Sequence, residues 1–353
     1  MNENLVDLKQ LTLQETVEFM AGLGEKPFRA RQARAWIFER GVSDFDAMSD
    51  LSKDFRQKLA HAARITCIKE RARQVSADGT MKFLFELDDG HAIESVLIPD
   101  GKRRTLCVST QVGCKLGCAF CLTGAGGFTR DLNAAEIIDQ VIQARRLSPE
   151  GRVTNVVLMG MGEPLDNYDN TVRALRVMTD EDFTIVGARR ITLSTAGMAN
   201  NIERLAREFP RVKLAVSLNA CDDELRGRLM PITRKYPLKR LIQALRAFPL
   251  PRGRRITLEY VMLAGVNDSM EDARKLIAIA KEFPSKINLI PYNEVPGAPF
   301  TRPAREVVEK FRQTVANAGL TVFIRDSRGV DIMAACGQLR ESQQSGAAPA
   351  VTV

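Results

Sequence analysis

Residues 114–121 read Cys114-Lys-Leu-Gly-Cys118-Ala-Phe-Cys121. The three cysteines follow a CxxxCxxC spacing, and a glycine between the first two helps the segment to fold back as a loop. Three thiolates in such a loop can each reach one iron of a [4Fe-4S] cluster, whereas ferredoxin-type clusters are held by four cysteines. We therefore expect these three cysteines to hold a cluster whose fourth iron stays open to another ligand.

Two other kinds of site fit part of this motif. A structural zinc site needs four ligands, but the chain offers a single CxxC and only two histidines, His61 and His91. A CxxC redox pair would leave Cys114 without a role. Such a pair is typical of a helix start, and the sequence predicts no helix start right at this motif. The iron–sulfur interpretation accounts for all three cysteines, and we prefer it.

The sequence that surrounds the motif alternates short apolar runs with longer amphipathic stretches. Six βα units in a row predict an α/β fold with a parallel sheet and right-handed crossovers. The pattern fits either an open doubly wound sheet or a partial barrel. Strands are expected at 105–109, 155–159, 191–195, 213–218, 256–262 and 287–291, with a seventh at 321–325.

The segments on either side of this core have other textures. Residues 1–63 are helical in pattern, with Thr12 and Glu15 spaced as a capping box, and predict an accessory module. Residues 64–99 contain short extended runs separated by Asp-Gly turns, so we expect a small antiparallel sheet that links this module to a core at 100–331. The segment 332–353 contains Cys336 and ends in a tail too poor in apolar residues to pack, which predicts disorder.

Polar and glycine-rich motifs follow several of the expected strands. In parallel α/β folds the active site lies at the carboxyl ends of the strands, so these motifs are expected to converge. They are the cysteine loop, Gly160-Met-Gly-Glu-Pro164, Ser194-Thr-Ala-Gly197, Ser217-Leu-Asn219 and Pro291-Tyr-Asn293.

These residues together resemble a known family. The cysteine motif with an aromatic residue before its last cysteine, and Gly-Glu-Pro after the second strand, are similar to radical S-adenosylmethionine (SAM) enzymes. Cys107 upstream of the motif and the run Arg325-Asp-Ser-Arg-Gly-Val-Asp-Ile-Met-Ala-Ala-Cys336-Gly resemble the RlmN family in particular. The resemblance extends to Leu339. It implies a partial (βα)6 barrel and methylation of carbon 2 of adenine in 23S ribosomal RNA and in transfer RNA.

The resemblance also implies the cofactors and their ligands. A [4Fe-4S] cluster would bind SAM at its open iron, and Gly162 with Glu163 would receive the SAM amino group. A carboxylate beside an ammonium group has an electrostatic purpose, although serine and asparagine at strand ends are also common as helix caps. The residues matched to the other polar groups of SAM are Ser194, Ser217, Leu218, Asn219 and Asn293.

Three further residues are matched to catalytic roles. Carbon 2 of adenine is electrophilic and cannot attack a methyl sulfonium, so the family first places a methyl group on a protein sulfur, here Cys336. The methyl carbon is then activated by a second SAM and bonded to the ring, which tethers enzyme and RNA. Cys107 would release the product by forming a disulfide with Cys336. Glu94 matches the proton acceptor, although an exposed strand glutamate is the default interpretation of the sequence alone.

Charge agrees with an RNA substrate. The net charge is +8, and residues 225–255 carry ten basic residues and no acidic one. This run is either a solvated face or a surface for the phosphate backbone. In the module, Lys26, Arg29, Arg31 and Arg34 could form a second contact surface. The ten basic residues are Arg226, Arg228, Arg234, Lys235, Lys239, Arg240, Arg246, Arg252, Arg254 and Arg255.

Other partners follow from the same interpretation. An electron donor such as flavodoxin or ferredoxin is expected, and the protein is expected to be a monomer. No stretch reaches the roughly 18 apolar residues of a membrane helix, and the acidic start is unlike a signal peptide, so we expect a cytoplasmic protein. Two rival functions stay open: methylation of carbon 8 of the same adenine, and noncatalytic RNA binding with a structural metal.

Overall fold

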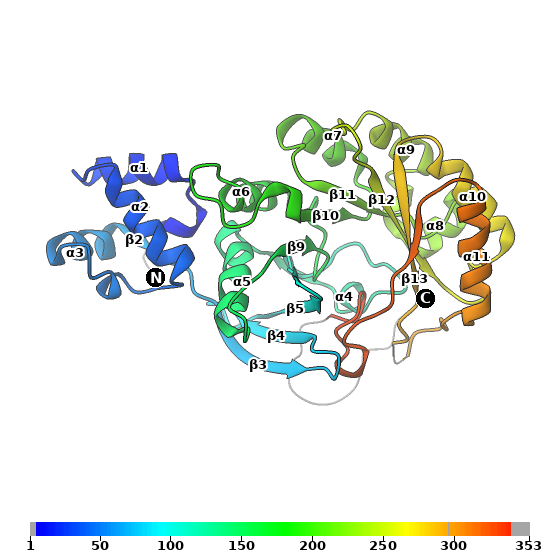
Figure 1. The fold of residues 1–353 in the computed structure, drawn as a ribbon, viewed down its shortest axis with the longest axis horizontal. Helices are drawn as coiled ribbons and strands as arrows, with labels where there is room; N and C mark the ends of the chain where they lie inside the picture. Colours follow the sequence, from blue (N-terminus) through cyan, green and yellow to red (C-terminus); the bar gives the residue numbers. More distant parts are fainter. Residues whose placement is uncertain (1–4, 296, 340–353) are drawn as a thin grey trace.

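A single sheet organises the computed structural model, which describes residues 5–295 and 297–339 (Figure 1). Within these residues ten strands form that sheet, in the order β14-β13-β12-β11-β10-β9-β6-β5-β4-β3. The parallel strands are β6 (Arg103–Cys107), β9 (Asn155–Leu158), β10 (Ile191–Thr195), β11 (Lys213–Ser217), β12 (Ile256–Met262), β13 (Ser285–Pro291) and β14 (Val322–Ile324).

The order of the parallel strands decides between the two predicted architectures. From β6 to β14 each parallel strand of this sheet pairs with the next parallel strand along the chain. The order has no reversal of the kind that defines a doubly wound sheet. With right-handed crossovers, an unreversed order puts all the helices on one face of the sheet. The six expected βα units are present, and the partial (βα)6 barrel is confirmed.

Helices cover the outer face of this barrel. Their starts follow local sequence signals, since Asn133 with Glu136 and Ser269 with Asp272 form capping boxes at two of them. The helices are α5 (Ala134–Leu147), α6 (Tyr168–Met178), α7 (Ala199–Glu208), α8 (Asp223–Leu229), α9 (Leu238–Arg246), α10 (Met270–Ala280) and α11 (Arg305–Asn317). The short helix α4 (Leu122–Ala125) is not part of this layer and lies beside the carboxyl-terminal segment (Figure 1).

The antiparallel strands do not form a sheet of their own. They are β3 (Lys69–Val75), β4 (Met81–Glu86) and β5 (Ala92–Asp100), and β5 pairs antiparallel with β6. The turn at Gly101, where φ is +51°, joins β5 and β6 as a hairpin. The expected linker sheet is thus a continuation of the barrel sheet, because β6 pairs with β5 on one side and with β9 on the other. A two-stranded ribbon, β7 (Gln111–Gly113) and β8 (Phe128–Asp131), flanks the cysteine loop.

The amino-terminal module packs against α5 and α6 (Figure 1). It contains α1 (Leu13–Gly22), α2 (Phe28–Arg34) and α3 (Lys53–Ala62), and the predicted capping box of Thr12 and Glu15 is present. Short parallel strands β1 (Val6–Asp7) and β2 (Ala63–Arg64) close the module. A buried ion pair between Lys9 and Asp139 of α5 fixes it to the barrel.

One residue of the expected second RNA surface is not on a surface. Arg34 is fully buried, donates to the carbonyl oxygen of Leu11 and pairs with Asp180 at 3.7 Å. Burial lowers the pKa of its guanidinium to about 10. Arg34 therefore joins the module to the barrel and is not available to RNA, because its guanidinium lies inside the protein beside Leu11 and Asp180.

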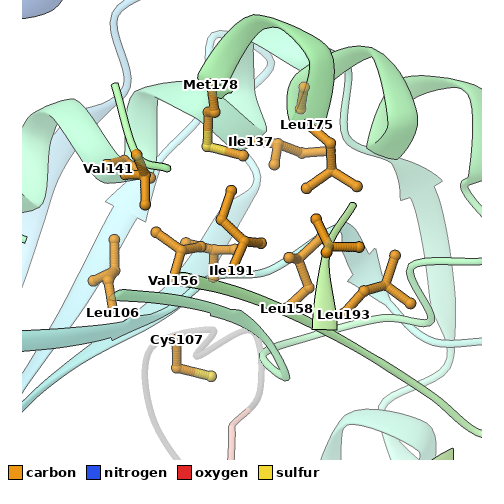
Figure 2. Packing of buried hydrophobic residues seen from close by; sticks show 14 of the residues in the cluster. Leu106, Cys107, Ile137, Val141, Val156, Leu158, Leu175, Met178, Ile191 and Leu193 are labelled. Atoms are coloured by element: carbon orange, nitrogen blue, oxygen red, sulfur yellow. The ribbon is translucent and has the colours of Figure 1, made fainter. Parts of the chain in front are cut away.

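The core lies between the sheet and the helices. Leu106 points toward α5 and α6 and contributes to a cluster with Val156, Ile191 and Val141 (Figure 2). Cys107, the next residue along β6, points to the opposite face (Figure 2). Successive side chains of a strand alternate between faces, so burial of Leu106 among the helices turns Cys107 into the barrel interior.

The carboxyl-terminal segment crosses the interior of the partial barrel. Its last described residues lie beside α4 and the ends of β3 and β4 (Figure 1). Asp331 accepts hydrogen bonds from the hydroxyl of Ser76 at 2.6 Å and the backbone N–H of Ala77 at 3.2 Å. The predicted disordered tail lies outside the described residues. None of the helices in the described part of the chain has the length and apolar character to span a membrane.

Candidate active site

The three cysteines of the motif lie in one loop between β7 and α4. Gly113 has a φ of +78°, and a Cβ there would lie 2.1 Å from the carbonyl oxygen of Gly127, so only glycine fits this turn. The backbone N–H of Cys114 donates to the same oxygen at 2.7 Å. All three thiols line one cavity, the main cavity, at the carboxyl ends of the strands. A short helix does begin directly after Cys121, in contrast to the expectation for this motif.

The donor set, three thiols that line one cavity, fits a cluster. Over residues 5–295 and 297–339 no three His, Cys, Asp or Glu side chains converge on one point as ligands of a single ion. Cubane clusters do not need such convergence, because each thiolate binds a different iron. Burial, together with the neighbouring thiols, raises the pKa of Cys114 to about 12 and that of Cys118 well above its ordinary value. A bound cationic cluster would offset this cost, since coordination removes the thiol proton.

Glu163 also lines the main cavity. Gly162 before it has a φ of +97° and lies against Gln111, where a Cβ would approach to 2.6 Å. The carboxylate accepts backbone hydrogen bonds from Leu165 at 3.0 Å and Ala196 at 2.7 Å, which ties the loop after β9 to the end of β10. Burial raises the pKa of Glu163 to about 7 despite these bonds. An ammonium group beside it would favour its ionised form.

This shift predicts a pH dependence of stability. The carboxyl of Glu163 titrates near its ordinary pKa of 4.5 in the unfolded chain and at about 7 in the folded protein. Between these values the folded state holds a proton that the unfolded state has lost, so the group lowers stability as the pH rises through this window. We expect Glu163→Gln to flatten the loss of unfolding free energy over this range in ligand-free protein.

Urea unfolding at several pH values measures this effect. Glu306→Gln, which removes an exposed carboxylate on α11, is the control and should leave the pH dependence unchanged. If the unfolding free energy of Glu163→Gln and of the unchanged protein depended equally on pH, this would contradict the raised pKa of Glu163.

The other residues matched to SAM fall into three groups. Ser194 and Ser217 line the main cavity and make no hydrogen bond through their hydroxyls within the described residues. Asn219 and Asn293 also line it, but the side-chain oxygen Oδ1 of Asn219 accepts from the backbone N–H of Val261 at 2.9 Å. Leu218 does not line the cavity, because its side chain is buried in the core behind the strand. Only its backbone groups could contribute a hydrogen bond to a ligand in the cavity.

An unpartnered polar atom supports a ligand in the main cavity. The buried hydroxyl of Tyr292 has no hydrogen-bond partner in the described part of the chain, and its ring lines the cavity. Buried polar groups are normally satisfied, so such a group calls for a partner that is not part of the chain. Tyr292 follows the last residue of β13, and the strand-end rule could have identified it.

Cys336 lies where two cavities meet. The side cavity adjoins the main one, and the residues that line both are Met159, Ile290, Asn293 and Cys336. The backbone N–H of Leu122 donates to the carbonyl oxygen of Gly337 at 2.8 Å, so the cluster loop holds the Cys336 segment directly. The side chain of Asn293 also donates to the carbonyl oxygen of Cys336, at 3.5 Å.

Cys107 lines the side cavity together with Cys336. Both are free thiols in this structure. Burial raises the pKa of Cys107 to about 12, with a further contribution from Cys336, while Arg325 acts in the opposite direction. The structure thus brings together the two cysteines that lie more than two hundred residues apart in sequence.

Arg325 and Glu259 were not identified by sequence reasoning. Arg325 follows β14 and lines the side cavity, and its Nη1 lies 3.6 Å from Oε1 of Glu259 on β12. The charges of Cys336, Glu259 and Cys107 raise the pKa of Arg325. A guanidinium in this position stabilises thiolate forms of the neighbouring cysteines. The place of Arg325 at the carboxyl end of the last strand was the signal that could have found it.

Glu94 is buried, which corrects its default interpretation as an exposed strand residue. Its carboxylate pairs with Lys82 of β4 at 3.1 Å. It does not line the main or the side cavity but a third hollow, which contains Met333 and Gln338 of the carboxyl-terminal segment. Val96, two residues along β5 on the same face, lines the side cavity. The structure therefore places Glu94 beside the catalytic region without bringing it to the paired cysteines.

Arg226 belongs to the basic run but not to its surface. It is fully buried, and its guanidinium donates to the carbonyl oxygens of Leu218, Ser217 and Ala196 and to the hydroxyl of Thr233. Burial lowers its pKa to about 10. It therefore clamps the carboxyl ends of β10 and β11, which carry Ser194 and Ser217, and corrects the assignment of this residue to a solvated or RNA-binding face.

Removal of this clamp should be costly. We expect Arg226→Met to lower the free energy of unfolding by at least about 3 kcal/mol, because buried carbonyl groups lose their partners. Urea unfolding measures the change. Arg228→Met, an exposed arginine on the same helix, is the matched control and should stay within about 0.5 kcal/mol of the unchanged protein. Similar losses of unfolding free energy for both variants would show that the buried hydrogen bonds of Arg226 do not contribute more to stability than an exposed arginine does.

Comparison with known proteins agrees with this geometry. A family model described as the ribosomal RNA large subunit methyltransferase N-terminal domain matches residues 4–65, and the radical SAM superfamily model matches residues 108–277. A dual-specificity RNA methyltransferase RlmN from Pelobacter propionicus is 50% identical over 334 residues, which cover 95% of each chain. The chain belongs to the RlmN family. The predicted family is thereby confirmed.

Further relatives agree. An RlmN protein from Geobacter sulfurreducens is 49% identical over 338 residues, covering 96% of this chain and 93% of that protein. The crystal structure of a radical SAM methyltransferase from Sphaerobacter thermophilus matches with a TM-score of 0.90 and 46% identity, over 95% of this chain and 99% of the other. RlmN proteins are radical SAM RNA methyltransferases, so the cofactors are a [4Fe-4S] cluster and SAM.

Proposed function

We propose that this RlmN protein forms 2-methyladenosine in 23S ribosomal RNA and in transfer RNA, using Cys336 as an intermediate methyl carrier. The observation that carries this proposal is the position of Cys336, which lines both the cavity of the cluster cysteines and the cavity of Cys107. One sulfur atom that faces two cavities is suited to receive a methyl group on one side and to present it to a base on the other.

The chain's residues have distinct tasks in this proposal. When bound, the cluster provides the electron for cleavage of SAM, and SAM provides the methyl group and the radical chemistry. Cys114, Cys118 and Cys121 hold the cluster, while Gly162, Glu163, Ser194, Ser217 and Asn219 orient SAM. The side chain of Asn293 positions Cys336 by donating a hydrogen bond to the backbone carbonyl oxygen of Cys336. The backbone of Leu218 shapes the cavity wall. The Cys336 sulfur takes the methyl group by displacement. Its methyl carbon would lose one hydrogen atom to the radical chemistry that SAM supplies when bound, and it would then bond to the ring.

Release requires a proton acceptor and a second thiol. We assign the second role to Cys107, whose thiolate attacks the sulfur of Cys336 in the thioether to the base. A disulfide forms, the electron pair of the broken carbon–sulfur bond goes to the carbon, and this carbon takes up a proton and becomes the methyl group of the product. Arg325 favours this step because it stabilises the attacking thiolate. We assign proton removal to Glu94. This assignment is supported by the position of Glu94 on β5, where it lies on the same face as Val96, a residue that lines the side cavity.

The domain assignments are part of the same proposal. The module at 1–63 contributes RNA binding, 64–99 links it to the barrel, 100–331 forms the radical SAM core and 332–353 supplies Cys336. An adenosine must leave its stack to enter the cavities, so a loop or bulged adenosine is the expected target. We further propose that the protein acts as a monomer in the cytoplasm, where its RNA substrates are, with an electron donor such as flavodoxin or ferredoxin.

The rival functions have less support. Relatives that are about 50% identical over 95% of the chain are RlmN proteins, which favours carbon 2 over carbon 8. A noncatalytic RNA-binding protein would have no need for Cys107 and Cys336 to share a cavity.

Mass spectrometry of nucleosides tests the proposed function. Holoenzyme, SAM and a reductant are incubated without oxygen with 23S and transfer RNA from cells that lack the modification. We expect 2-methyladenosine in both RNAs. A product methylated at carbon 8, or no methylated adenosine in either RNA, would overturn the proposal.

A further inference from the structure

The opposite edge of the barrel from the thiols is rich in positive charge. Parallel strands all begin at the same edge, and basic residues stand at the start of most of them. This basic edge consists of Arg103 of β6, Arg189 and Arg190 before β10, Lys213 of β11, Arg254 and Arg255 before β12, and Lys286 of β13. None of them takes part in the active site described above.

A hollow lies at the centre of the basic edge. Its wall contains Lys213, Arg254, Arg255 and Lys286, and among residues 5–295 and 297–339 no carboxylate lines it. Its floor is apolar and includes Val212, Leu214, Phe248 and Leu250. A concave site with several cations and no acidic residue is suited to an anion.

The positive charge of the hollow is not neutralised by the protein. Within the described residues, none of its four cations forms an ion pair, whereas nearby acids are already paired, Glu282 with Arg246 and Glu181 with Arg211. Burial and then the charges of Lys286, Arg254 and Arg103 lower the pKa of Lys213. The fold thus holds like charges together at a cost, which an external anion would remove.

We propose that the basic edge binds the phosphodiester backbone of the substrate RNA at a segment distant from the target adenosine. This inference rests on the proposed function, because it takes RNA as the substrate. The cations line the starts of several neighbouring strands, which suits an extended polyanion better than a single small anion. An acidic electron-donor protein fits less well, because the cluster cysteines lie at the other end of the strands.

The test compares RNAs of two lengths. Lys213→Gln with Lys286→Gln removes two charges whose side chains make no hydrogen bond within the described residues, so folding should be retained. Arg305→Gln with Lys310→Gln removes two exposed charges on α11 and is the matched control. Binding of full-length transfer RNA and of a short hairpin that carries the target adenosine is measured over a series of salt concentrations.

The proposal makes a quantitative prediction. The dependence of log affinity on log salt should become less steep by about 1 for each lysine removed, with full-length RNA only. The hairpin and the control variant should show no change. An unchanged slope with full-length RNA, or an equal loss with the hairpin, would overturn the proposal.

Further measurements distinguish other anions and the proposed function itself. Inorganic phosphate is tested as a second ligand. If it binds the unchanged protein saturably but not the lysine variant, while both proteins have the same salt dependence of RNA affinity, the hollow is a small-anion site and the proposal is wrong. The same holds if only an acidic donor protein loses affinity. Methylation of full-length transfer RNA by the unchanged protein is followed in parallel. Its absence would refute the proposed function, whereas the RNA slopes alone decide the role of the basic edge.

Discussion

Replacement of Cys336 by alanine is expected to reduce RNA methylation to background while the cluster stays in place. Cys336 lines both cavities but lies outside the loop that carries the three cluster cysteines. The variant should hold about four irons per chain, like the unchanged protein, because its cluster ligands are intact. Methylation should fail because adenine carbon 2 is electrophilic and offers no nucleophile to SAM.

Two measurements accompany this prediction. The peptide that contains Cys336, from protein produced in cells, should be heavier by about 14 Da, the mass of one CH2 group, and the alanine variant should lack this increase. Cys221→Ala, which removes a thiol outside both cavities, is the control and should methylate RNA normally. Methylation by Cys336→Ala would show that the methyl group travels directly from SAM to the RNA.

The barrel could be predicted from sequence because its signals are local. The strands β10 and β12 begin and end at the predicted residues, and the polar motifs after the strands converge on one cavity as the parallel topology requires. The three cysteines, Glu163 and Ser194 were therefore found from spacing and position alone. Cys107 and Cys336 needed the family resemblance, since no local pattern joins residues so far apart.

What the sequence did not reveal depends on tertiary contacts. Arg34 and Arg226 are buried, although basic residues suggest a solvated face, because each contacts oxygen atoms of residues distant in sequence. Glu94 is buried because Lys82 of the neighbouring strand pairs with it. Hydrophobic periodicity describes which face of an element is apolar, and it contains no information about which polar residue will find a partner inside the core.

Replacement of Cys107 by alanine is expected to trap the enzyme on its RNA. Cys107 shares the side cavity with Cys336, lies outside the cluster loop and points into the barrel interior from β6 (Figure 2). Its loss should leave methyl transfer to Cys336 and bonding to the base intact, since neither step uses its sulfur. Release should fail. The product should be a covalent complex of protein and RNA in most of the molecules that have reacted.

Denaturing gel electrophoresis under reducing conditions detects this complex as a slowly migrating band that disappears after nuclease treatment. A thioether between Cys336 and the base resists thiols, whereas a disulfide would be reduced, so persistence of the band identifies the bond. The double variant Cys107→Ala with Cys336→Ala should form no complex, because it lacks the bridging sulfur. A complex in the double variant would place the tether on another residue.

The same variant separates release from packing. If Cys107 served only as a small buried residue, its replacement would cost some stability but leave the RNA free and turnover close to normal. Urea unfolding and iron content, measured beside the gel, show whether the fold and the cluster persist. An intact cluster with normal turnover and no covalent complex would remove Cys107 from the mechanism. A trapped complex on an intact fold would show that release needs a second thiol in the side cavity. In this structure that thiol is Cys107.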